Sequence, residues 1–141
     1  MGLMVDANVF IDFERRGLPI DLSRWQPSDD LFISVVTASE LLMGVHRANS
    51  EERRQRRSAV VEAILAGVSV LDFTVAVARC HARIYAELAG RGQLIGAHDL
   101  IIAATALHHR LSLLTSNTDE FSRVPDLDVI RFVASELGEN A

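Results

Sequence analysis

The sequence predicts a three-layer α/β fold in which helices flank a parallel β-sheet on both faces. Short apolar runs rich in β-branched residues alternate along the whole chain with amphipathic stretches, which is the order of strands and helices in such folds. The length of 141 residues is that of one ordinary domain, and 49% hydrophobic and 23% charged residues are typical of a globular chain. We therefore expect residues 1–141 to form a single domain.

The elements of the first half follow from hydrophobic pattern and turn residues. The apolar run at 2–5 is expected to form a strand that leads through a polar turn into a helix over 9–13. Pro19 and Pro27 interrupt an irregular segment over 17–30, which has room for one helical turn. Further strands are predicted at 31–36 and 68–73, and further helices at 37–47, 51–66 and 74–89.

The second half continues the alternation. A glycine-containing loop at 90–92 precedes a strongly apolar helix, which is predicted over 100–109. A strand over 111–114 leads into a polar loop at 115–119, and a last strand is predicted over 127–132. Because strands alternate with helices, we expect the strands to lie parallel.

The charge of the chain excludes several classes of protein. Fourteen basic residues against nineteen acidic ones give a net charge of −5, which argues against holding nucleic acid by a broad basic surface. Every basic residue is arginine, so chemistry that requires lysine is excluded, such as that of a P-loop or a Schiff-base enzyme. The single cysteine, Cys80, excludes a disulfide scaffold and a multi-cysteine zinc site.

The pattern of apolar residues predicts no association with a membrane. The longest apolar run, at 100–107, is far too short to span a bilayer, and the chain does not open with a secretory signal. We expect a cytoplasmic protein.

Acidic and amide side chains follow the predicted strands. Asp6 comes directly after the first strand, Glu40 lies just past the second, and Asp99 opens the helix before the strand that Asn117 and Asp119 follow. Ligands of open parallel sheets bind at the carboxyl ends of the strands, so these distant positions are expected to meet at one edge. A site made only of oxygen donors suits Mg²⁺ or Mn²⁺ rather than zinc.

Each of these acids also has a purely structural interpretation. Asp6 has the position of a helix N-cap, and Asp99 lies in a first helical turn, where the helix dipole favours a negative charge. Thr37 and Glu40 have the spacing of a capping box at the start of a helix. Any one of the acids is explained in this way, whereas their common placement at strand ends indicates a site.

Four segments resemble the sequence motifs of PIN domains, in order and at typical spacing. They are MVDANVFI at 4–11, ISVVTASELLMGV at 33–45, IGAHDLIIAA at 95–104, and LTSNTDEF at 114–121 with VPDL at 124–127. The resemblance covers nearly the whole chain. Within PIN proteins, the compact form is most similar to VapC, the toxin of bacterial VapBC type II toxin–antitoxin pairs.

The resemblance implies roles for particular residues. Asp6, Glu40 and Asp99 correspond to the acids that hold a divalent metal, and Thr115 would orient a carboxylate or a bound water. Asn117 stands where many relatives have a fourth aspartate, which puts a second metal in doubt. Asp119 is expected to supply the missing charge and to join the metal ligands.

By the same resemblance, the activity would be that of a metal-dependent endoribonuclease acting on structured RNA such as tRNA. A Mg²⁺ ion held by the acids would activate a water for attack on a phosphodiester. Phosphate contacts are predicted for the arginines at the start of the helix over 51–66, which are Arg53, Arg54, Arg56 and Arg57. The alternative for them is a solvated helix face that pairs with Glu51 and Glu52.

The resemblance also implies partners. We expect a homodimer that binds a VapB-type antitoxin, as a heterotetramer or a larger assembly, with operator DNA contacted only through the antitoxin. Groove residues for that antitoxin are predicted on the early helices, namely Phe10, Phe13, Leu42 and Val45. The alternative function is a catalytically weak PIN-like module that binds RNA or protein, which the amide of Asn117 would favour. A small phosphatase is disfavoured because the chain has no lysine.

Overall fold

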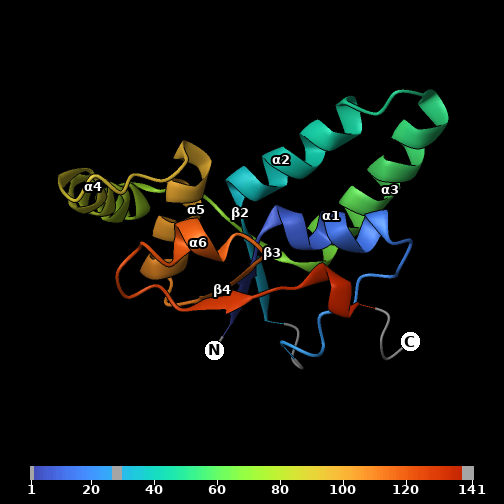
Figure 1. Cartoon of the computed structure of the whole chain (residues 1–141). Coiled ribbons are helices and arrows are strands. Elements are labelled where there is room, and N and C mark those ends of the chain that lie inside the picture. The colour runs from blue at the N-terminus through green and yellow to red at the C-terminus, as the bar shows by residue number, and fades with distance from the viewer. Residues whose placement is uncertain (1, 27–29, 138–141) are drawn as a thin grey trace.

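Five parallel strands form one sheet at the centre of the protein, as predicted (Figure 1). The structure is a computed structural model that describes residues 2–26 and 30–137. The strand order is β3-β2-β1-β4-β5, with β1 and β4 side by side in the middle. The strands are β1 (Leu3–Val5), β2 (Leu31–Ser34), β3 (Ser69–Leu71), β4 (Ser112–Thr115) and β5 (Val129–Arg131).

Helices cover both faces of this sheet. Figure 1 shows α1, α2 and α3 on one side and α4 and α5 on the other. The helices are α1 (Ala7–Arg15), α2 (Val35–His46), α3 (Glu51–Gly67), α4 (Val75–Gly90), α5 (Ala97–His108) and α6 (Thr118–Phe121), followed by a 3₁₀ turn, η1 (Ala134–Glu136). No helix within the described residues is long and apolar enough to cross a membrane.

The two central strands supply both cores because successive side chains point to opposite faces of a sheet. Val5 of β1 and Leu114 of β4 are fully buried among the side chains of α1, α2 and α3. Their neighbours Met4 and Leu113 are fully buried in the second core, among the side chains of α4 and α5. The near-continuous apolar sequence of these strands therefore reflects burial on both faces.

An aromatic cluster joins the end of the chain to its beginning. Phe132 directly follows β5 and is 2% exposed, with ring centroids 6.0 Å from Phe13 of α1 and 5.4 Å from Trp25. Trp25 lies in a turn closed by hydrogen bonds to the carbonyl of Leu22, within the segment that was expected to be irregular. Pro27 of that segment lies outside the described residues.

Helix α2 begins two residues before its predicted start, and the predicted capping box is wrong. Ser34 is the N-cap, and its Oγ accepts a hydrogen bond of 3.1 Å from the backbone N–H of Val36. Thr37 lies inside the helix, fully buried, with a hydroxyl that has no hydrogen-bond partner among the described residues. Ser34 caps the helix because the β2 strand ends on it with extended backbone, the conformation that an N-cap requires.

The loop expected at 115–119 is partly helical. The short helix α6 begins at Thr118 after Asn117. Four residues show no hydrophobic periodicity, so the pattern of the sequence carries no signal for such a turn. The turn decides which of the acids after β4 reaches the site.

Candidate active site

Three of the predicted acids, Asp6, Glu40 and Asp99, lie together at the carboxyl ends of the central strands. Asp6 directly follows β1, and Thr115 ends β4, the strand paired with β1. The chain leaves β1 toward β2 on one side, while β4 lies on the other side of β1. The carboxyl ends of β1 and β4, which we call the β1/β4 edge, are therefore the topological switch point where open α/β sheets bind ligands. Glu40 reaches this edge from α2 and Asp99 from the first turn of α5.

Asp6 is the buried member of the group, with 5% of its surface exposed. Its Oδ1 accepts a hydrogen bond of 2.8 Å from the backbone N–H of Ala7, so it also caps α1. Its Oδ2 accepts hydrogen bonds from the Thr115 hydroxyl at 2.7 Å and the Asn8 amide at 3.1 Å. Burial raises the pKa of Asp6, and the three hydrogen bonds oppose that rise. The structural and the site interpretation of Asp6 therefore both apply.

Thr115 and Asn8 hold Asp6 in place against the end of β4. The Thr115 hydroxyl, which donates to Asp6, accepts from the backbone N–H of Asn117 at 3.0 Å. The Asn8 amide also reaches Thr115 Oγ1 at 3.4 Å, and its carbonyl oxygen accepts from the Ser116 N–H at 3.3 Å. Thr115 is expected to orient a carboxylate, and its hydrogen bond to Asp6 is consistent with that role. Asn8 was not predicted, although it lies two residues after Asp6.

Asp99 and Glu120 form a hydrogen-bonded pair whose pKa values shift in opposite directions. Burial, the hydrogen bond with Glu120 and the nearby charges of Asp6, Glu120 and Glu40 raise the pKa of Asp99 to about 7. The same hydrogen bond and one from Asn117 lower the pKa of Glu120. Asn117 Nδ2 donates to Asp99 Oδ2 at 3.3 Å and to Glu120 Oε2 at 3.2 Å. Asn117 therefore bridges two acids as a donor.

Glu40 of α2 is the acid that lies near both Asp6 and Asp99. Burial is the first cause that raises the pKa of Glu40, and repulsion from Asp6 is the second. Nδ1 of the exposed His98 lies 3.7 Å from Glu40 Oε1, which partly offsets the rise in this pKa. His98 precedes Asp99, so α5 carries both a repelling and an attracting group toward Glu40.

The structure brings Glu120 to this edge, whereas Asp119, the acid that was predicted to join the site, lies away from it. The Asp119 side chain is exposed and contacts none of the acids at the β1/β4 edge among the described residues. The reason is α6, because successive residues of a helix point about 100° apart. The sequence offered one signal, since Glu120 lies three residues after Asn117 and so shares its side of a helical turn.

The donors at this edge suit a hard cation. They are carboxylate, amide and hydroxyl oxygens, the ligands that Mg²⁺ and Mn²⁺ prefer. Burial raises the pKa of Asp6, Glu40 and Asp99, and repulsion from neighbouring acids raises the pKa of Glu40 and Asp99 further. A bound cation would oppose both effects. In the described part of the chain, no group of three or more Asp, Glu, His or Cys side chains is arranged to hold an ion as it stands.

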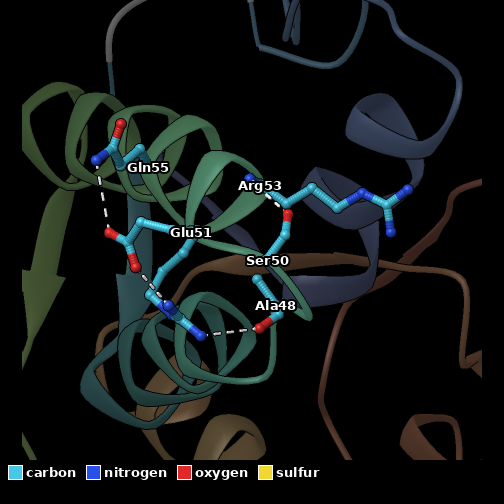
Figure 2. A network of polar contacts seen from close by, with 6 residues as sticks. Ala48, Ser50, Glu51, Arg53 and Gln55 are labelled. Carbon is cyan, nitrogen blue, oxygen red and sulfur yellow. Dashed lines mark hydrogen bonds and ion pairs between the residues drawn. The ribbon is translucent and has the colours of Figure 1, made fainter.

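The predicted arginine cluster at the start of α3 is mostly engaged within the fold. Arg54 donates to Glu51 Oε2 at 2.6 Å and to the carbonyl of Ala48 at 3.1 Å, in the network shown in Figure 2. Arg53 donates to Asn49 Oδ1 at 2.8 Å. The pairing with Glu51 is the alternative that the sequence left open.

The two remaining arginines of the cluster differ. Arg57 donates to Glu14 Oε1 at 3.1 Å and to the carbonyl of Gly44 at 2.8 Å, which ties α3 to α1 and α2. Arg56 is exposed. Phosphate contacts of the cluster stay a prediction, which Arg56 fits better than Arg57.

The four predicted groove residues do not line one groove. Phe13 and Val45 are buried in the core, and Leu42 is exposed on α2. Phe10 lines an apolar cavity of about 570 Å³ between α1, the segment at 17–22 and α3. Apolar residues on an amphipathic helix pack into the core first, and the sequence does not separate core residues from groove residues. Antitoxin contacts of these four residues stay a prediction.

The sheet order and the acids at the β1/β4 edge agree with comparisons to known proteins. The sequence profile of the PIN domain matches residues 3–127. Ribonuclease VapC1 of Rickettsia felis is 35% identical over 130 residues, which cover 92% of this chain and 96% of that protein. The tRNA(fMet)-specific endonuclease VapC of Shigella flexneri is 39% identical over 129 residues, covering 90% and 95% of the two chains.

A solved structure extends the likeness to three dimensions. The structure of DNA-bound VapBC from Salmonella typhimurium superposes with a TM-score of 0.83 at 29% identity, covering 93% of this chain and 98% of the other. The chain therefore belongs to the PIN-domain family and, within it, to the VapC ribonucleases. Its enzyme class is that of a nuclease that acts on RNA.

Proposed function

We propose that the chain is the toxin of a type II toxin–antitoxin pair, a Mg²⁺-dependent endoribonuclease that cleaves structured RNA such as tRNA. The observation that carries the proposal is that four acids from separate segments of the sequence lie together at the β1/β4 edge. These are Asp6, Glu40, Asp99 and Glu120, which we call the acid group. Repulsion between these acids raises the pKa of Asp99 and Glu40, after burial as the first cause. Such an arrangement costs stability in the free protein, which indicates that it serves a ligand.

Asp6 and Asp99 would hold the cation, with Glu40 and Glu120 beside them. When bound, the ion lowers the pKa of a water and neutralises charge on the phosphate. The protein's own groups supply the rest. Thr115 and Asn8 keep the Asp6 carboxylate oriented, and Asn117 holds Asp99 and Glu120 beside each other.

The relatives support the substrate and the partner that we propose. The Shigella protein is named for tRNA(fMet), and the Salmonella structure is a VapBC complex bound to DNA. For this chain we propose inhibition by a VapB-type antitoxin, with DNA contacted through that antitoxin. The chain's net charge of −5 suits a basic inhibitor better than broad binding to nucleic acid.

Cleavage of purified tRNA by the wild-type protein and its Asp6→Asn and Asp99→Asn variants tests the proposal. We expect cleavage in Mg²⁺, no cleavage in EDTA, and rates below about one hundredth of wild type for either variant. Growth after induction in a bacterial host should arrest only with the wild type. Co-expression of a VapB-type antitoxin should restore growth.

Asp72→Asn is the matched control, because Asp72 is exposed and follows the edge strand β3, outside the acid group. It should cleave like the wild type. Full activity in EDTA, or in Asp6→Asn, would contradict the metal site. Metal-independent RNA binding without cleavage would instead support the alternative of a catalytically weak binding module.

A further inference from the structure

A groove of about 320 Å³ lies between α1, α2 and α3. These three helices pack on the same side of the sheet (Figure 1). Three arginines line it: Arg15 at the end of α1, Arg47 directly after α2, and Arg57 on α3. Its acidic lining residues are Glu14 and Glu40. In a chain whose net charge is −5, this groove concentrates positive charge.

The groove is continuous with the acid group through Glu40. This side chain lines the groove and also repels Asp6 and Asp99 electrostatically. Helices α1 and α2 both begin at this edge, at the ends of β1 and β2, and lead away from it. Arg47 lies about 10 Å beyond Glu40 along α2, at ~1.5 Å of rise per residue.

The charges in the groove are unequally compensated. Arg57 is fixed by its bonds to Glu14 and the carbonyl of Gly44, so this pair is balanced. Glu40 belongs to the acid group, where a bound cation would compensate it. The side chains of Arg15 and Arg47 make no hydrogen bond or ion pair with any described residue. Two guanidinium groups are therefore available to an anionic ligand.

We propose that Arg15 and Arg47 bind a backbone phosphate of the RNA next to the scissile phosphate in the same strand. Arg57 lines the same groove but is held in place by Glu14 and the carbonyl of Gly44. This inference rests on the proposed function, because a strand cut at the acid group must continue along the neighbouring surface. Guanidinium groups match phosphate oxygens in geometry as well as charge. A carboxylate of a protein partner is the competing ligand, but only a nucleic acid strand also has a phosphodiester for the acid group.

The test is binding of a fluorescein-labelled single-stranded 12-nucleotide RNA of random sequence, followed by anisotropy in CaCl₂ over a series of salt concentrations. A gel at the end checks that the RNA is intact. The Arg15→Gln/Arg47→Gln double variant should bind about tenfold more weakly, and the slope of log K against log salt should fall by about 1.4. Both side chains lack partners in the described structure, so the melting temperature should not change.

The matched control is Arg16→Gln/Arg79→Gln, which removes the same charge from exposed positions outside the groove, one just after α1 and one on α4. It should keep the wild-type slope. An unchanged slope for Arg15→Gln/Arg47→Gln would overturn the proposal. Binding of a labelled hexaglutamate peptide is measured in the same way. If the double variant lost affinity for this peptide but not for RNA, the groove would be assigned to a protein partner and the proposal would be overturned. Failure of the wild type to cleave RNA would reject the proposed function alone, since binding is measured separately.

Discussion

At the scale of residues, the site depends on which of two adjacent acids faces the edge. Glu120 is hydrogen-bonded to Asp99 and accepts a hydrogen bond from Asn117, whereas Asp119 is exposed. Glu120→Gln should therefore lower the rate of RNA cleavage about 10- to 100-fold, the usual effect of a residue that supports metal ligands. Asp119→Asn is the control and should keep nearly full activity. The opposite result, a loss with Asp119→Asn alone, would restore the sequence-based assignment.

The Asp99 carboxyl makes stability depend on pH in the absence of divalent cations. Its pKa in the folded protein is raised from 3.8 to about 7, so the folded state binds more protons than the unfolded state between these values. The free energy of unfolding should therefore fall as pH rises through this window, and the raised pKa values of Asp6 and Glu40 act in the same direction.

Urea unfolding in EDTA at pH 5 and pH 8 measures this dependence. Asp99→Asn should be more stable than the wild type at pH 8 and should show a smaller difference between the two pH values, because it removes one of the repelling charges. Asp72→Asn should behave like the wild type. A wild-type protein that is more stable at pH 8 than at pH 5 would show that these acids are well compensated.

At the scale of elements, the start of α2 distinguishes the observed cap from the one that the sequence suggested. Ser34→Ala should lower the free energy of unfolding by about 1 kcal/mol, because the N–H of Val36 loses its acceptor. Thr37→Val should leave stability unchanged or raise it, since the Thr37 hydroxyl is buried without a partner among the described residues. Chemical denaturation of both variants measures the difference. A larger loss for Thr37→Val would favour the capping box.

Some features of the fold and of the site were predictable from the sequence, and others were not. Strand positions were predictable because β1 and β4 are apolar on both faces, and each acid that directly follows a strand was predictable with them. Asp6 is such an acid. The start of α2 was not predictable, because Ser34 and Thr37 are both favourable N-cap residues. Which of them caps the helix depends on where the backbone changes from extended to helical. Glu120 was not, because its direction depends on α6, which is too short to leave a pattern.

At the scale of the whole molecule, the aromatic cluster fixes the last part of the fold. Phe132→Ala should lower the free energy of unfolding by about 3–5 kcal/mol, because it removes a buried ring that packs against Phe13 and Trp25. Phe73→Ala is the matched control, since Phe73 is 44% exposed and its loss should cost less than about 1 kcal/mol. Chemical denaturation compares the two. Equal losses would mean that the cluster adds no more than an exposed ring.

The pairing of β1 with β4 has a consequence for the order of events during synthesis. Leu3 lies opposite Ser112, so β1 is synthesised well before the strand with which it pairs. Long-range pairing of this kind closes late, because the chain between must be ordered at the same time. Asp6 cannot meet Thr115 in a nascent chain that still lacks β4. The group of acids at the carboxyl ends of β1 and β4 can therefore form only after β4 has been synthesised.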